Sequence, residues 1–148
     1  ADLIKVISPN GFYVGELGTG MKLKFVTNLV ACINGAAVVE GMAFAQTLGL
    51  DLGQVAKIVA ASPGATSGQF QLRAPLIADG EFDGELASLA VMTEMVRQIA
   101  EAADEFEAQT PTLSAVKAAY EEFAQHVDPL TTGPSQMFHH LQGHPVAS

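Results

Sequence analysis

The feature that most constrains the fold is a long, proline-free stretch from Met21 to Leu48, in which good helix formers dominate. Gly49 follows it, and glycine is the residue that most often ends a helix. At about 1.5 Å per residue, one continuous helix here would be on the order of 40 Å long. The stretch is apolar nearly all round, as in helices buried at the centre of a structure. We therefore expect one long central helix around which the rest of the chain packs.

The same stretch is apolar enough to raise the question of a membrane span. It is interrupted by Asn28, Asn34, Glu40 and Gln46, and polar groups are costly in hydrocarbon. We therefore expect a buried helix in a soluble protein, with no membrane contact. The first residues lack the pattern of a signal peptide, and a single cysteine, Cys32, allows no internal disulfide. Both observations favour a cytoplasmic protein, in which Cys32 is a buried small hydrophobe.

Length and composition favour one acidic, folded domain. Of the 148 residues, 49% are hydrophobic and 16% are charged, which excludes a disordered chain. The formal net charge of -9 excludes the basic face that nucleic-acid binding needs, so no nucleic acid is expected as a partner. The high apolar fraction indicates a hydrophobic face that another domain or subunit covers.

Shorter helical patterns fill the rest of the chain, so the predicted fold class is all-α with about six helices in total. Their predicted starts are Asp51, then Thr66 or Ser67, about Leu86, Pro111 and Ser135. Pro75 would kink or interrupt its helix. Gly35 and Gly41 lie inside the long helix, where each costs about 1 kcal/mol against alanine. We expect them to mark close approaches of neighbouring helices.

The start of the long helix carries the residues most suited to chemistry. Gly15, Gly18 and Gly20 are spaced G-x-x-G-x-G, which is not the G-x-G-x-x-G of a self-contained dinucleotide site. Lys24 and Asn28 follow, four residues apart and therefore on one helix face. Two interpretations are open. Lys24 either extends its head to solvent beside a structural amide, or it is an acid/base whose pKa is lowered by burial and by the positive helix end.

The segment GELGTGMKLKFVTN resembles a motif of the β-hydroxyacid dehydrogenases, the family of 3-hydroxyisobutyrate dehydrogenase, related to 6-phosphogluconate dehydrogenase. The family pattern is G-x-x-G-x-G-x-x-x-K-x-x-x-N at the start of a long interdomain helix. Its fixed positions are matched by Gly15, Gly18, Gly20, Lys24 and Asn28. The segments VVEGMAFAQTLGLD, SPGATSGQF and APLIADGEFD are also similar to the family, so the likeness covers about residues 15–133.

This resemblance implies an oxidoreductase that acts on the CH–OH group of a small hydroxy acid. Lys24 would be the catalytic acid/base that removes the hydroxyl proton, while Asn28 and Gly20 would bind the substrate. NAD or NADP would be held mainly by an N-terminal Rossmann domain outside these residues. Residues 1–14 would be the entry segment from that domain, 15–142 the helical substrate and dimerisation domain, and 143–148 a flexible tail. A homodimer is expected, and the chain alone should be nearly inactive.

One departure from the family pattern concerns the cofactor. The family usually has a Lys-Asp pair in the second long helix, and Thr93 and Glu94 stand at those positions. Thr93 cannot place a cation near the nicotinamide, so the cofactor-binding residues stay unknown. The alternative hypothesis to a dehydrogenase is therefore a helical dimerisation module with a decayed active site. A third hypothesis is an acidic adaptor that binds another protein.

The histidines His126, His139, His140 and His144 gather toward the C-terminus. A spacing of four can hold a metal ion on a helix. Gly143 and Pro145 interrupt the helix here, however, and no carboxylate joins these histidines in the sequence pattern. We therefore predict no metal site and a surface tail.

Overall fold

The computed structural model describes residues 11–82 and 85–144, and it confirms the all-α fold built on one long helix. No strand occurs in the part of the chain that it describes. The elements are α2 (Thr19–Thr47), α3 (Leu52–Ala60), α4 (Gly68–Asp79), α5 (Leu89–Glu105), α6 (Pro111–Phe123), the 3₁₀ helix η1 (Pro134–Gln136) and α7 (Met137–Leu141). Most of the expected entry segment and of the expected tail lies outside the described ranges.

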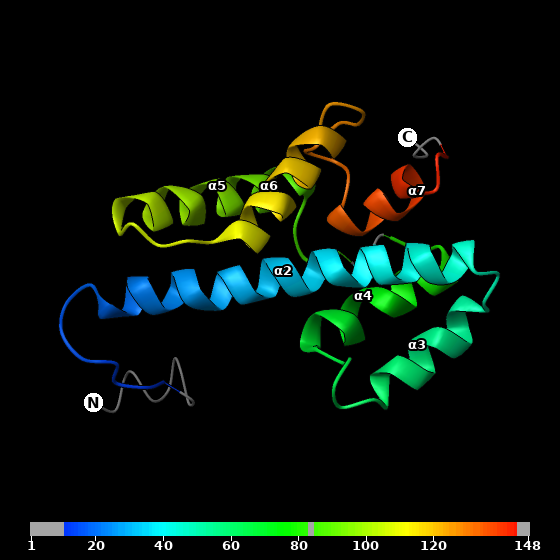
Figure 1. Ribbon diagram of the computed structural model, residues 1–148, viewed down its shortest axis with the longest axis horizontal. Coiled ribbons are helices and arrows are strands. Elements are labelled where there is room, and N and C mark those ends of the chain that lie inside the picture. Colours follow the sequence, from blue (N-terminus) through cyan, green and yellow to red (C-terminus); the bar gives the residue numbers. More distant parts are fainter. Residues whose placement is uncertain (1–10, 83–84, 145–148) are drawn as a thin grey trace.

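Helix α2 runs the length of the molecule, with α5, α6 and α7 on one side and α3 and α4 on the other (Figure 1). Its burial is uneven. The buried residues all lie between Cys32 and Ala45, near the middle of the helix and in its C-terminal half, whereas Met21, Leu23, Val26 and Val30 are exposed. The expectation of a helix buried all round is therefore wrong for the N-terminal half within this chain. By length and composition alone α2 could cross a membrane, but 44% of its most apolar window is buried against the other helices.

The ends of the helices follow local rules that the sequence predicts. Gly49 has a φ of 72°, and its N–H and that of Leu50 bond the Gln46 and Ala45 carbonyls at 2.9 and 3.0 Å, which is a Schellman motif. Asp51 accepts the Gln54 N–H at 2.7 Å, and Ser67 accepts the Phe70 N–H at 3.1 Å. These contacts confirm both predicted N-caps.

The core forms where the regularly spaced apolar side chains of α5 and α6 pack against the C-terminal half of α2. Its members on α5 and α6 are Leu89, Met92, Val96, Ile99, Leu113, Val116, Tyr120 and Phe123. Cys32 is fully buried among them, as predicted, and burial raises the pKa of its thiol to about 11. Phe106 continues the α5 pattern but is 57% exposed, because α5 extends past the end of the covered part of α2.

A buried ion pair joins the two sides of the fold. Arg73 of α4 meets Glu85 at 2.7 Å, and their side chains are only 11% and 8% exposed. Ser135 of η1 completes the arrangement, since its hydroxyl accepts from Arg73 at 2.9 Å and donates to Glu85, and its N–H bonds Glu85 at 3.1 Å. Three segments that are distant in sequence are thereby fixed at one point. Gln69 accepts the Arg73 Nε–H at 2.9 Å and orients the guanidinium.

Two interior features depart from the sequence expectations. A Cβ at Gly35 would lie 3.3 Å from Arg73 Nε, so Gly35 does mark a close approach of α4. Gly41 is exposed and has no described atom within 4 Å of such a Cβ, so the same expectation is wrong there. Pro75 lies inside α4 without interrupting it.

Replacing Arg73 with alanine should lower the free energy of unfolding by about 3–5 kcal/mol, because the Glu85 carboxylate would be left buried without a partner. The matched control is Arg97→Ala. Arg97 also pairs with carboxylates, but it is 45% exposed, so its loss should cost at most about 1 kcal/mol. Urea denaturation of both variants measures the difference. Equal losses would contradict the role assigned to the buried pair.

A second pair of variants tests how much the left-handed backbone conformation at the start of α2 contributes to the free energy of unfolding. Gly18 is the N-cap, with a φ of 92° and no atom near its Cβ position in the described structure. Gly18→Ala should therefore destabilise by about 1–2 kcal/mol through backbone strain alone. Gly41→Ala, at an equally open helical position, should stabilise by about 1 kcal/mol. Thermal and urea unfolding should give opposite signs, and a shared sign would refute the assignment at Gly18.

Candidate active site

The glycine-containing turn before α2 ends at Gly18, the N-cap residue, and no side chain caps the helix. The Thr19 N–H bonds Glu16 O at 3.1 Å and the Met21 N–H bonds Gly18 O at 3.1 Å. No described atom pairs with the N–H of Gly20, which lies between them. Gly20 is also exposed. An unpaired N–H at a helix N-terminus can donate to an anion such as a carboxylate.

Gly20, Lys24 and Asn28 follow one another at intervals of four along α2, so they form one stripe on its surface. Lys24 and Asn28 line a pocket of about 130 Å³ between α2 and α5. The other residues of its lining are Met21, Phe25, Met95, Gln98 and Ile99. The structure thus brings Lys24 and Asn28 together over an apolar floor, with an amide on the opposite wall.

Lys24 is exposed and Asn28 is half-buried in this chain. The burial that the acid/base hypothesis invokes for Lys24 is therefore not provided by the described residues themselves. The neighbouring Lys22 faces another way, since its ammonium lies over the Phe106 ring at 5.1 Å from the centroid. The two lysines are close in sequence but have different surroundings.

Thr93 and Glu94, which stand at the cofactor positions of the family pattern, do not line the pocket that holds Lys24. The Thr93 hydroxyl donates to Leu89 O of its own helix at 2.9 Å. Glu94 accepts from Arg97 at 2.6 Å and from Gln98 at 2.7 Å. The hydrogen bond from Arg97, followed by that from Gln98, lowers the pKa of Glu94 to about 2. Neither residue offers a free cation.

Gln98 is a pocket residue that sequence reasoning missed. It lies on α5 across from Lys24 and Asn28, and its amide also donates to Glu94. Gln98 therefore connects the pocket to the Glu94–Arg97 pair. The only sequence signal for it is its spacing of four from Glu94 on the polar side of α5.

An apolar groove of about 270 Å³ lies beside the pocket, between the exposed half of α2 and the end of α5. Its lining includes Phe25, Val26, Leu29, Ala102 and Phe106. Met21 and Leu23, on the same half of α2, are also exposed, so this half presents several uncovered apolar side chains.

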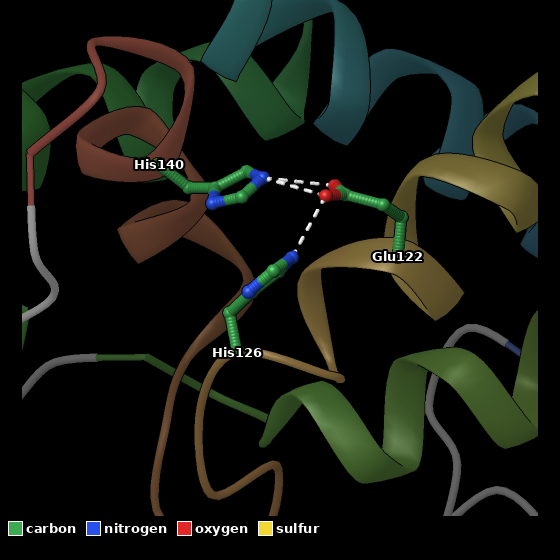
Figure 2. A group of neighbouring side chains, drawn as sticks. All are labelled: Glu122, His126 and His140. Carbon is green, nitrogen blue, oxygen red and sulfur yellow. Dashed lines mark hydrogen bonds and ion pairs between the residues drawn. The ribbon is translucent and has the colours of Figure 1, made fainter.

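The histidine prediction needs a correction. Glu122 of α6 does join two of the histidines, since its carboxylate lies 3.0 Å from His126 Nε2 and 2.8 Å from His140 Nε2 (Figure 2). Desolvation raises the pKa of Glu122, but the hydrogen bonds from His140 and His126 outweigh it and hold that pKa below its ordinary value. The sequence did not predict the Glu122–His140 contact because the two residues belong to different helices, and helical spacing relates only residues within one helix.

Comparison with known proteins agrees with the motif. Residues 18–139 match the family described as NAD-binding of NADP-dependent 3-hydroxyisobutyrate dehydrogenase. No curated protein sequence matches the chain.

Two solved structures share the fold. One is 3-hydroxyisobutyrate dehydrogenase from Salmonella typhimurium, with a TM-score of 0.74 and 20% identity over 80% of this chain and 41% of that one. The other is 3-hydroxyisobutyrate dehydrogenase from Mycobacterium tuberculosis with L-serine, with a TM-score of 0.76 and 22% identity over 88% and 46% of the two chains. The protein thus spans less than half the length of these enzymes. Because the family match covers most of the chain, the protein belongs to the NAD-binding family of 3-hydroxyisobutyrate dehydrogenases.

Proposed function

We propose that this chain is the C-terminal catalytic and dimerisation domain of an NAD(P)-dependent oxidoreductase that acts on the CH–OH group of a small hydroxy acid. The observation that carries the proposal is the stripe of Gly20, Lys24 and Asn28, whose last two members share one pocket. The stripe supplies an anion donor, a base and an amide in a row. A hydroxy acid carries a carboxylate and a hydroxyl close together, which suits that order.

In this proposal the Lys24 amine accepts the proton of the substrate hydroxyl, and it returns that proton in the reverse reaction. The amine must then be neutral in the working state. Cover of Lys24 by another domain or subunit would supply the desolvation that favours a neutral amine. The Asn28 amide would fix the substrate beside Lys24, while the Gly20 N–H donates to the substrate carboxylate.

The residues at the family's cofactor positions are already engaged in hydrogen bonds within α5. The Thr93 hydroxyl donates a hydrogen bond to Leu89 O, and the Glu94 carboxylate accepts hydrogen bonds from Arg97 and Gln98. We therefore assign the binding of NAD or NADP mainly to a Rossmann domain of the same protein. That domain would also cover Lys24 and close the open side of the pocket.

A second copy of the chain is the other expected cover for α2. The exposed half of α2 and the groove beside it form a larger apolar surface than scattered single residues would give. Symmetric pairing of such a surface is the commonest way in which soluble proteins bury it.

The alternative is a helical dimerisation module without dehydrogenase activity. The absence of a free cation at Thr93 and Glu94 favours it, together with the exposure of Lys24 in this chain. The two functions differ in one respect that can be measured, namely whether Lys24 is needed for turnover.

The test uses a longer protein that contains this chain together with its nucleotide-binding domain, screened with small 3-hydroxy acids and NAD+ or NADP+. Lys24→Ala should lower kcat/KM by at least about 100-fold, a typical acid/base contribution. The matched control is Lys22→Ala, which removes a lysine whose ammonium lies over Phe106 and should leave turnover nearly unchanged. Equal effects of the two variants, or no turnover by a folded wild type, would favour the structural module.

The dimer is tested separately by light scattering on the chain itself. A dimer should be present at tens of micromolar, and Val26→Glu should shift it toward monomer, because a charge would enter the apolar groove. Leu130→Glu is the control, since Leu130 is exposed but lies outside that groove. A wild type that stays monomeric would refute the dimer without bearing on catalysis.

A further inference from the structure

A second cluster of chemically active side chains lies outside the pocket of Lys24. Glu122 is in the last turn of α6, His126 follows four residues later, and His140 is on α7. One ligand atom from each of these side chains lies within 4.8 Å of the others. Figure 2 shows that both rings direct a nitrogen at the Glu122 carboxylate.

Two of the distances between these atoms are close to the distances between ligands of a coordinated ion. Zinc bonds to imidazole nitrogen and carboxylate oxygen are about 2.0–2.2 Å long, so ligands in a tetrahedral shell lie about 3.3 Å apart. The carboxylate oxygens of Glu122 lie 3.0 Å from His126 Nε2 and 2.8 Å from His140 Nε2. The His126 and His140 nitrogens lie within 4.8 Å of each other, so the two rings would have to approach by up to about 1.5 Å to complete a tetrahedral shell.

The protein holds these side chains in place before any ion arrives. The His140 ring packs on Phe123 with centroids 5.4 Å apart, and it stacks on the His126 ring at 4.9 Å. Its side chain is only 27% exposed. Glu122 and His126 are each 54% exposed, so an ion could enter from solvent and keep a water ligand on the open side.

We propose that Glu122, His126 and His140 form a binding site for a divalent transition-metal ion of the zinc class. Two imidazoles and one carboxylate suit zinc, cobalt and nickel, whereas magnesium and calcium prefer oxygen ligands alone. A neutral imidazole can carry its proton on either ring nitrogen, so a change of tautomer frees the Nε2 lone pair for the ion. The bound ion would tie α7 to the end of α6.

The test is titration of the chain with ZnCl2 by calorimetry, with CoCl2 as a spectroscopic probe of the coordination. The wild type should bind one ion, show the visible bands of cobalt in a nitrogen–oxygen site, and gain thermal stability. His126→Ala and Glu122→Gln should each weaken binding by at least about tenfold, since even indirect partners of a metal cost 10–100-fold. Cys32 is fully buried and does not compete.

The matched control is His144→Ala, which removes an exposed histidine that lies outside the cluster. It should bind zinc as the wild type does. His140→Ala should also lose binding, and its melting temperature without metal shows whether the Phe123 packing survives. No saturable binding by the wild type would overturn the proposal, as would unchanged binding by His126→Ala and Glu122→Gln. Loss of binding in His144→Ala would place the metal on the C-terminal histidines instead.

Discussion

The Arg73–Glu85 ion pair is the interaction on which the arrangement of the helices depends. A buried charge is tolerated only when it is paired and hydrogen-bonded, and here the partners come from three different segments. Gln69 and Arg73 belong to α4, Glu85 follows it, and Ser135 begins the C-terminal segment. Gly35 of α2 gives the guanidinium its room. A shift of α4, of Glu85 or of the Ser135 segment would break at least one of these hydrogen bonds.

The glycine at position 133 extends the same constraint. A Cβ there would lie 2.8 Å from Glu85 Cγ and closer still to its carboxylate, although the backbone φ of −85° suits any residue. Space rather than conformation therefore requires glycine. The turn before η1 is packed directly against the ion pair, which fixes where the C-terminal helices meet α2.

Helix α2 has two environments, and they correspond to two tasks. Its C-terminal half is packed on both sides and provides a rigid base. Its N-terminal half carries the stripe of Gly20, Lys24 and Asn28 beyond that base, and α5 lies beside it (Figure 1). A site on a rigid helix is positioned more accurately than one on a loop. The exposed apolar surface around the stripe is what a covering domain or subunit would contact.

Much of the fold could be predicted from the sequence because its determinants are local. The caps at Asp51 and Ser67, the stop at Gly49 and the core face of α5 each depend on residues within a few positions. The Gly18–Lys24–Asn28 motif was recognisable for the same reason. The Arg73–Glu85–Ser135 contact and the Glu122–His140 contact were missed, since they join residues up to 62 positions apart. The uneven burial of α2 could not be predicted either, because an apolar helix face can be buried by the same chain, by another domain or by another subunit, and composition does not distinguish these.

The contribution of Ser135 has a consequence for the order in which the protein can fold during synthesis. Arg73 and Glu85 leave the ribosome well before Ser135 and α7, which also packs on α2 and donates from Gln142 to Ala43 O at 2.7 Å. Until then Arg73 and Glu85 lack their hydrogen bonds with Ser135, and α2 lacks its contacts with α7. Between the synthesis of α2 and that of η1 and α7, the nascent chain therefore exposes apolar surface of α2, which is the kind of surface that makes partly folded chains prone to aggregate.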